Sequence, residues 1–240
     1  MKWRQRWSLL GLSPRPKHPL IEENEKYFSS LDQNKHLRDC EFVCFDTELT
    51  GLNPRRDEIV AIGAVRITGL SIVPGDTFFT YVRPTRPIPK DSTLVHRITS
   101  EQLKDAPDPE KVLPAFVAYV GPALLLGHYV QLDVNFLNRA LKKYLGGIIR
   151  NPCLDSMKLA QAHHEYRRRS ERGYVSPYMP LNLGLLAKEY DLPKFAQHDA
   201  LGDAMQTAYL FLFLVTKLQE AGYVTLNDLY SAGKIPLMVR

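Results

Sequence analysis

The sequence of 240 residues has little cysteine, no long apolar run and no large excess of charge of either sign. Its three cysteines, Cys40, Cys44 and Cys153, are too few for a disulfide framework, and their spacing does not indicate a zinc ribbon. We expect them to be buried as small apolar residues in a reducing cytoplasm. No stretch approaches the ~18 consecutive apolar residues of a membrane-spanning helix, so no transmembrane segment is expected.

The remaining composition is that of an ordinary globular chain. Hydrophobic residues make up 45% and charged residues 24%, which argues against a disordered, collagen-like or coiled-coil protein. The 31 basic and 26 acidic residues give a net charge of +5, which permits a polyanionic partner without establishing one. The length fits one domain of ~200 residues with an appendage.

Residues 1–38 are expected to form a basic N-terminal arm, because no acidic residue precedes Glu22. Trp3, Trp7 and Leu10 would share one stripe of a helix. Such an arm packs on its own domain, is disordered, or docks on a membrane surface or a protein such as a polymerase subunit. Its apolar run is too short for a signal peptide. Residues 39–220 are expected to form the domain, with residues 221–240 as a tail packed on it.

Hydrophobic patterning predicts strands first and helices later. Strands are expected at 41–48, 58–68, 77–83, 123–128 and 153–155. The turn residues Pro74-Gly75-Asp76 predict that the second and third strands are antiparallel. Helices are expected from Thr99 and at 109–120, 133–144, 156–165, 182–190, 199–220 and 225–231, with a loop at 166–180. This order predicts an α/β fold with a mixed five-stranded sheet flanked by helices.

Two acidic residues, Asp46 and Glu48, close the first strand. Residues i and i+2 of a strand point to the same face, so both carboxylates project from the end of a buried strand. Adjacent unpaired carboxylates repel each other, and a bound divalent cation removes that repulsion. Taken alone, Asp-x-Glu is usually a solvated strand end.

Two further segments carry polar groups at the starts of helices. Asp133 follows a buried strand that ends at Gly127-His128, and Asp203 follows His198 by five residues. Each aspartate taken alone is explained by the helix macrodipole. Together, four carboxylates could hold two hard cations, Mg²⁺ or Mn²⁺, in a two-metal site, with one histidine to take a proton from water.

These motifs resemble those of the DnaQ-like 3′–5′ exonucleases of the DEDDh type, a family that includes the proofreading subunit of bacterial DNA polymerase III. The similar segments are Phe45-Asp46-Thr47-Glu48-Leu49-Thr50-Gly51, His128 to Leu137, His198-Asp199-Ala200-Leu201-Gly202-Asp203-Ala204, and Val95-His96-Arg97-Ile98-Thr99. The resemblance covers about residues 41–215 and implies an RNase H-like fold.

The resemblance also implies roles for single residues. Asp46, Glu48 and Asp203 would bind the catalytic metal, Asp46 would bridge to a second ion, and Asp133 would act through water or that second ion. His198 would be the general base. Contacts to the terminal nucleotide would come from Thr47, Thr50, Leu52, His96 and Phe136.

Three positions depart from the family pattern without removing a metal ligand. Leu49 stands where the family often has Thr, Arg97 where it usually has Gly, and Tyr129-Val130 where Asn-Ala is commoner. These departures concern substrate preference and leave the reaction unchanged.

The function that the resemblance implies is hydrolysis of single-stranded 3′ ends to nucleoside 5′-monophosphates, with DNA preferred over RNA. The setting would be proofreading, repair or turnover in the cytoplasm. The alternatives are an exoribonuclease and a non-catalytic nucleic-acid-binding relative, although all five catalytic residues are retained.

A histidine-rich segment and an arginine-rich segment are further candidates for function. His163-His164-Glu165 resembles a metal cluster, but adjacent helical side chains diverge, so a shared ion is not expected. Arg167-Arg168-Arg169 with Arg172 either steers a phosphate backbone or forms a solvated loop.

Overall fold

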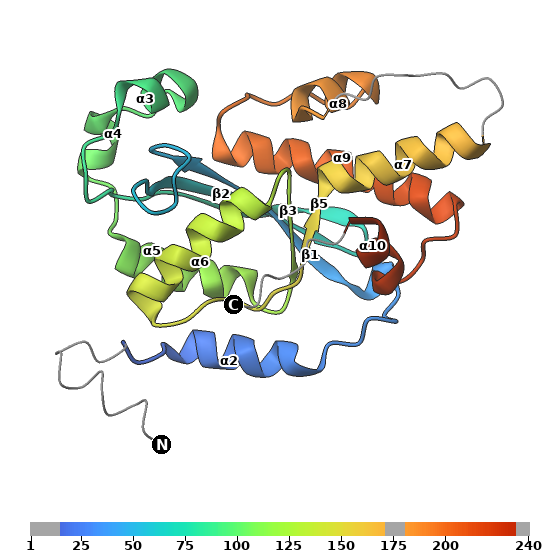
Figure 1. The fold of residues 1–240 in the computed structure, drawn as a ribbon, viewed down its shortest axis with the longest axis horizontal. Coiled ribbons are helices and arrows are strands. Elements are labelled where there is room, and N and C mark those ends of the chain that lie inside the picture. Colours follow the sequence, from blue (N-terminus) through green and yellow to red (C-terminus); the bar gives the residue numbers. More distant parts are fainter. Residues whose placement is uncertain (1–14, 171–180, 234–240) are drawn as a thin grey trace.

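A five-stranded mixed sheet forms the centre of the computed structural model, which describes residues 15–170 and 181–233 (Figure 1). The strands are β1 (Glu41–Leu49), β2 (Ile59–Thr68), β3 (Ser71–Tyr81), β4 (Leu124–Gly127) and β5 (Cys153–Asp155), in the order β3-β2-β1-β4-β5. β1 pairs antiparallel with β2 and parallel with β4. The predicted mixed sheet is therefore confirmed, with β1 at its centre.

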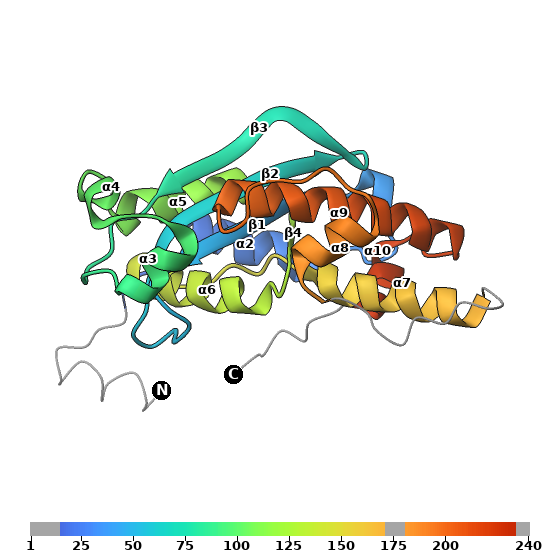
Figure 2. The same ribbon diagram turned by 90° about the horizontal axis from the view of Figure 1, so that it is seen from above.

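Helices cover both faces of this sheet (Figures 1 and 2). One face carries helices α2, α5 and α6, and the other carries helices α7 to α10. Their bounds, with those of the short helices α3 and α4, are α2 Pro19–Tyr27, α3 Lys90–His96, α4 Ser100–Lys104, α5 Pro109–Val120, α6 Gln131–Leu145, α7 Ser156–Ser170, α8 Leu183–Glu189, α9 Ala200–Glu220 and α10 Leu226–Gly233.

Side chains of β1 alternate between two apolar cores. Val43 and Phe45 pack in the core under α5 and α6, whereas Phe42 and Cys44 pack in the core under α9. Both faces of the strand are buried because helices lie on both sides, which is why the sequence of β1 is a nearly continuous apolar run. All three cysteines are free and buried, as predicted.

The turn between β2 and β3 lies earlier than the sequence pattern predicts. It is made by Gly69 and Leu70, both with φ near +60°, and β3 begins at Ser71. Gly75, at φ +77°, lies inside the strand, where the pairing with β2 becomes irregular. The prediction of a turn at residues 74–76 was therefore wrong, because a glycine that permits a bulge has the same sequence signature as one in a turn.

Four helices differ from the prediction. Helix α2, at Pro19–Tyr27, lies in the segment expected to form an arm, where no helix was predicted at these residues. Helix α3 was missed, because seven residues are too few for a clear 3.6-residue period. Helix α6 begins at Gln131, two residues early. Helix α7 continues to Ser170, so the predicted loop was wrong over residues 166–170. Arg167, Arg168 and Arg169 form its last turn, where cations interact favourably with the helix dipole.

The remainder of the predicted loop, with Arg172, lies outside the described residues. Among the residues that the structure does describe, no helix is long and apolar enough to cross a membrane.

The described part of the N-terminal segment packs against the domain. Ile21 of α2 is fully buried in the core under α5 and α6, and Leu37 is fully buried in the core under α9. A β-bridge joins His36 to Thr225 just before α10. Trp3, Trp7 and Leu10, on which the expectation of a docking arm rests, lie outside the described residues.

Candidate active site

Three carboxylates from two elements meet at the end of β1. Asp46 and Glu48 share one face of the strand, and Asp203 comes from the first turn of α9. One oxygen of each carboxylate lies within 4.8 Å of the others. Strand alternation brings the first two together, as the sequence predicts, and the approach of α9 to the sheet supplies the third.

A glycine in β2 permits this approach of α9. Gly63 pairs with Asp46 in the sheet, and a Cβ at Gly63 would lie 2.2 Å from the Ala200 carbonyl carbon and 2.3 Å from the Leu201 nitrogen. The start of α9 therefore rests directly on the β2 backbone. Asp199 caps the helix by accepting a hydrogen bond of 3.1 Å from the Gly202 N–H.

Asp133 reaches the site from α6, on the other side of β1. Its Oδ1 accepts hydrogen bonds from the Thr47 N–H at 3.0 Å and the Thr47 hydroxyl at 2.5 Å. The pairing of β1 with β4 ends at Cys44, so the Thr47 N–H, beyond that ladder, uses Asp133 as its acceptor. Asp133 is therefore anchored to β1 through Thr47 and does not belong to the group of three carboxylates.

Burial and mutual repulsion raise the pKa values of these carboxyl groups. The pKa of Asp46 lies well above its ordinary value because of burial, with further contributions from the charges of Asp133, Asp203 and Glu48. Burial, then the charges of Asp203 and Asp199, raise the pKa of Glu48 to about 7. Burial also raises the pKa of Asp133 to about 7, although the two Thr47 hydrogen bonds oppose the shift.

The donor set fits a hard divalent cation. Within residues 15–170 and 181–233, no lysine or arginine forms a salt bridge with Asp46, Glu48 or Asp203. A cluster of buried carboxylates without a cationic partner is stabilised by a bound metal, and oxygen ligands favour Mg²⁺ or Mn²⁺. In the same ranges, Asp46, Glu48 and Asp203 form the group of acidic, histidine or cysteine side chains whose geometry fits a metal site.

His198 lies at the exposed edge of the acid cluster. Its backbone is left-handed, with φ +57°, and its N–H donates a hydrogen bond of 2.9 Å to Asp203 Oδ2. This bond fixes the loop before α9 to the acid cluster, while the residue itself remains exposed to solvent. The charge of His198 also acts on His96, whose pKa is lowered mainly by burial and then by this charge.

Three of the predicted nucleotide contacts support the walls of the site. The Thr47 hydroxyl binds Asp133, and the Thr50 hydroxyl accepts a hydrogen bond of 2.9 Å from the Glu58 N–H, which closes the loop after β1. His96 is 6% exposed, and its Nδ1 accepts a hydrogen bond of 3.0 Å from the Ile98 N–H. Its Nε2 has no hydrogen-bond partner within the described part of the chain.

The other two predicted contacts lie in contrasting surroundings. Leu52 is 76% exposed in the loop after β1. Phe136 is 2% exposed and lines a cavity between α6 and the sheet. The structure thus brings together the three carboxylates, His198 and the two threonines.

A family model described as an exonuclease (RNase T) matches residues 43–211, which include every residue of the acid cluster. The chain belongs to the RNase T/DnaQ-like exonuclease family. Its mixed sheet with flanking helices is the RNase H-like fold of exonuclease structures, as the sequence predicts.

Several relatives of known name are similar to most of this exonuclease domain. It is 32% identical to "DNA polymerase III subunit epsilon" of Aquifex aeolicus over 79% of the chain and 87% of that protein. It is 38% identical to "DNA polymerase III subunit epsilon-like protein" of Rhodobacter capsulatus over 77% of the chain and 25% of that protein. The structure "Exonuclease X in complex with 5′ overhanging duplex DNA" aligns with a TM-score of 0.57 and 26% identity, covering 80% of the chain and 99% of that protein.

The much longer PolC-type polymerases contain a similar domain. The protein named "DNA polymerase III PolC-type" of Thermotoga maritima is 31% identical over 88% of this chain, which spans 14% of that protein. The matched region is therefore one part of a large polymerase chain.

Two of the departures from the family pattern occupy unusual backbone conformations. Arg97 ends α3 with φ +60°, and Tyr129 precedes α6 with φ +55°. Left-handed conformations favour glycine and asparagine, the residues that the family pattern usually has there. Larger side chains thus occupy these two left-handed positions here, and the side chain of Tyr129 is 45% exposed.

Two further histidines, His128 and His163, make contacts within the fold. His128 contacts the Ser156 hydroxyl at 2.9 Å through Nδ1 and the Leu181 carbonyl at 2.7 Å through Nε2. His163 is buried against the Tyr190 hydroxyl, at 3.4 Å from Nδ1. Within the described ranges, His163, His164 and Glu165 do not form a group with the geometry of a metal site.

Proposed function

We propose that the protein is a metal-dependent 3′–5′ exonuclease that hydrolyses the terminal phosphodiester of single-stranded nucleic acid. It prefers DNA to RNA and releases nucleoside 5′-monophosphates. The observation that carries the proposal is the cluster of Asp46, Glu48 and Asp203 within 4.8 Å, beside the anchored Asp133. The relatives named as polymerase III epsilon subunits, and the neighbour bound to duplex DNA, support DNA as substrate.

Asp46, Glu48 and Asp203 would hold the catalytic metal, with Asp46 and Asp133 placed to serve a second ion. Two Mg²⁺ or Mn²⁺ ions would supply positive charge for the attacking oxygen, the phosphate and the departing 3′ oxygen. The carboxylates fix this positive charge at the end of β1, and Thr47 holds Asp133 beside it.

His198 would act as the general base that takes the proton from the attacking water. Its backbone N–H is bound to Asp203, so the base is tied to a metal ligand, and its exposure leaves room for water and substrate. Leu52, exposed in the loop after β1, would pack against the terminal nucleotide.

Matched oligonucleotides labelled at the 3′ or 5′ end test the polarity and the substrate. We expect metal-dependent release of mononucleotides from the 3′ end, inhibition by EDTA, and faster cleavage of DNA than of RNA. Release from the 5′ end would refute the polarity, and faster cleavage of RNA would favour the exoribonuclease alternative. A folded, metal-bound protein that cleaves nothing would favour the non-catalytic alternative.

The named relatives also bear on the cellular setting. Similarity to polymerase subunits supports proofreading or repair in the cytoplasm, with single-stranded 3′ ends as partners. Docking on a polymerase subunit through residues 1–38 stays a prediction. Co-purification of the full chain, compared with a chain that lacks residues 1–14, measures whether that segment recruits a partner.

A further inference from the structure

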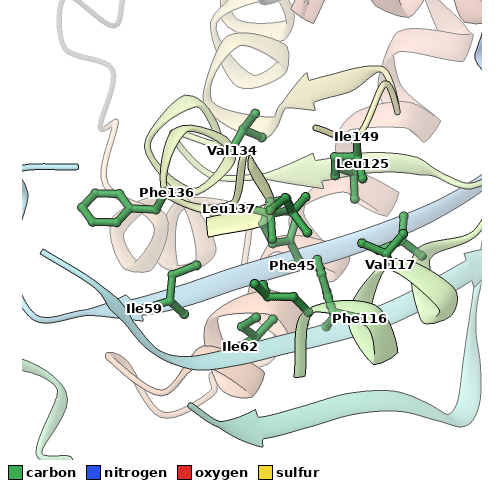
Figure 3. Packing of buried hydrophobic residues seen from close by; sticks show 14 of the residues in the cluster. Phe45, Ile59, Ile62, Phe116, Val117, Leu125, Val134, Phe136, Leu137 and Ile149 are labelled. Atoms are coloured by element: carbon green, nitrogen blue, oxygen red, sulfur yellow. The ribbon is translucent and has the colours of Figure 1, made fainter. Parts of the chain in front are cut away.

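A cavity on the α6 side of the sheet has an apolar floor and a cationic rim. It lies between the loop after β1, the segment after β3, and helices α5 and α6, and its volume is about 190 Å³. The floor is formed by Ile59, Ile62, Val82, Leu113 and Phe136. Figure 3 shows Ile59 and Phe136 at one end of the core cluster, where the Phe136 ring points away from the other labelled side chains. The rim is formed by Arg55, Arg56, Arg83, Arg86, Arg139 and Lys143.

The two acidic residues at this cavity already have partners. Asp57 Oδ2 accepts a hydrogen bond of 2.8 Å from the Asn53 N–H. Glu58 accepts hydrogen bonds from the N–H and hydroxyl of Thr85, at 2.8 and 2.7 Å, and lies 4.0 Å from Lys143. Six cationic side chains therefore face two carboxylates that are engaged elsewhere.

Most of the rim lacks an acidic partner. Arg83 pairs with Asp108 at 3.5 Å. Across the two described ranges no carboxylate lies within salt-bridge distance of the other four arginines, Arg55, Arg56, Arg86 and Arg139. An anion is the complement of such a rim.

Backbone contacts hold the rim in place. Arg139 donates from Nη2 to the Arg55 carbonyl at 2.9 Å, and Arg86 donates from Nη1 to the Arg56 carbonyl at 3.3 Å. Each contact uses one of the five N–H donors of a guanidinium group and leaves the others for a ligand. The loop after β1 is thereby tied to α6 and to the segment after β3, so the site is largely preformed.

The cavity shares helix α6 and the loop after β1 with the proposed active site. Phe136 follows Asp133 by three residues on α6, and Arg139 follows one turn later. At 1.5 Å of rise per residue, Arg139 lies roughly 9 Å along the helix axis from Asp133. Arg55 follows the exposed Leu52 in the loop after β1. A strand whose terminal phosphate lies at the acid cluster would reach the cavity about two or three nucleotides from its 3′ end.

We propose that this cavity is a subsite for an internal nucleotide of the substrate strand, with the base against the apolar floor and the phosphate on the arginine rim. The size is suitable, because an apolar protein cavity of about 150 Å³ takes up benzene. Base contact with an aromatic and aliphatic floor is tolerant of sequence, as an exonuclease requires. This proposal rests on the proposed function and adds a second point of attachment to it.

The test uses the full-length protein, two cavity variants and a control. Arg55→Ala/Arg139→Ala removes two rim charges, Ala140→Leu fills the cavity without changing its charge, and Arg38→Ala removes an exposed arginine before the opposite end of β1. The two substrates are the 4-nitrophenyl ester of thymidine 5′-monophosphate, which reaches the acid cluster alone, and a single-stranded DNA dodecamer.

We expect hydrolysis of the ester to be unchanged in all variants. For the dodecamer, KM should rise on the order of tenfold in both cavity variants and remain unchanged in Arg38→Ala. The slope of log KM against log salt should fall by about two in the double arginine variant, because each phosphate contact contributes about one. Ala140→Leu should leave that slope unchanged.

Fluorescence anisotropy of a labelled dodecamer in EDTA measures binding at the subsite independently of hydrolysis. Unchanged affinity in both cavity variants would overturn the subsite, whereas loss of hydrolysis in the native protein with the affinity pattern intact would overturn only the proposed function. Thymidine 5′-monophosphate that binds the native protein but not the cavity variants, with dodecamer affinity unchanged, would assign the cavity to a free nucleotide and overturn the proposal.

Discussion

Asp203 is the carboxylate that joins α9 to the acidic end of β1, and it also accepts the backbone hydrogen bond of His198. Single residues in this cluster therefore have separable effects on the metal, the base and the charge of the site.

Replacing Asp203 by Asn should abolish most of the metal-dependent cleavage while the protein stays folded, because one charged ligand is lost and the shape is kept. We expect a fall in kcat of at least about 10²–10³-fold. Glu101→Gln on the exposed surface of α4 is the control, since it also removes one negative charge. A near-normal rate in the Asp203 variant would contradict the metal assignment.

Replacing His198 by Ala should slow hydrolysis by roughly 10²–10⁴-fold and flatten the rise of rate with pH near neutrality. The metal-induced rise in Tm should persist, because the hydrogen bond to Asp203 comes from the backbone. An unchanged pH profile of kcat would show that the base lies elsewhere.

The raised pKa of Glu48 gives the metal a pH-dependent effect on stability. The Glu48 pKa is about 7 in the folded protein, against an ordinary value of 4.5. Between these values the folded state without metal binds more protons than the unfolded state, so its free energy of unfolding falls as the pH rises. A bound cation favours the deprotonated carboxylates, so Mg²⁺ should raise Tm more at pH ~8 than at pH ~5. Equal gains at both pH values, measured by calorimetry, would contradict this site as the source.

At the scale of elements, the active site depends on how closely α9 approaches β2. Gly63 is the point of contact, and a methyl group there would overlap the backbone at Ala200 and Leu201. The helix cannot yield without moving Asp203, which lies in its first turn.

Gly63→Ala should therefore displace the start of α9 and reduce both metal affinity and kcat, at a cost of about 1–3 kcal/mol in the free energy of unfolding. Val65→Ala is the control, because Val65 lies two residues along the same face of β2 and packs in the core under α9. It should lose stability while keeping metal affinity. Equal losses of metal affinity in both variants would mean that Gly63 has no special positioning role.

The sequence predicts elements with strong periodicity and misses contacts made across the sheet. β1 was recognisable because its apolar run ends in acidic residues. α9 was recognisable because a long apolar face follows Asp203 in its first turn. The hydrogen bond between Thr47 and Asp133 could not be predicted, because it joins positions 86 residues apart and depends on where β4 stops pairing with β1. The burial of Phe136 was missed because its motif does not show which side of α6 faces the sheet.

At the scale of the whole molecule, helix α2 is fastened to the domain by a buried polar network. Asn24 Nδ2 donates to Asn151 Oδ1 at 2.6 Å, and Asn24 Oδ1 accepts from the Arg150 N–H at 2.6 Å. Asn151 Nδ2 in turn donates to the Ala123 carbonyl at 2.7 Å, just before β4. Residues 150 and 151, just before β5, thus link α2 to the chain just before β4.

Asn24→Leu should lower the free energy of unfolding by about 1–3 kcal/mol, because Asn151 and the Arg150 N–H lose their partner. Cleavage of DNA under native conditions should be unchanged, because the network is remote from the acid cluster. Glu23→Ala on the exposed side of α2 is the control and should be neutral in chemical denaturation. Removal of residues 1–38 should destabilise the whole domain, because it also removes the buried Ile21, Asn24 and Leu37. Full stability of the shorter chain lacking residues 1–38 would contradict this account.

The alternation of side chains along β1 has a consequence for any preparation of the protein. Sliding β1 by one residue against β2 would exchange its two faces and turn Asp46 and Glu48 toward the face on which Val43 and Phe45 now pack. Burying two charged carboxylates in that apolar core is far costlier than unfolding the strand. In every folded molecule Asp46 and Glu48 therefore point to the face covered by α9. The fraction of active molecules should equal the fraction of folded ones. Counting bound metal per folded chain would then serve as a direct titration of competent protein.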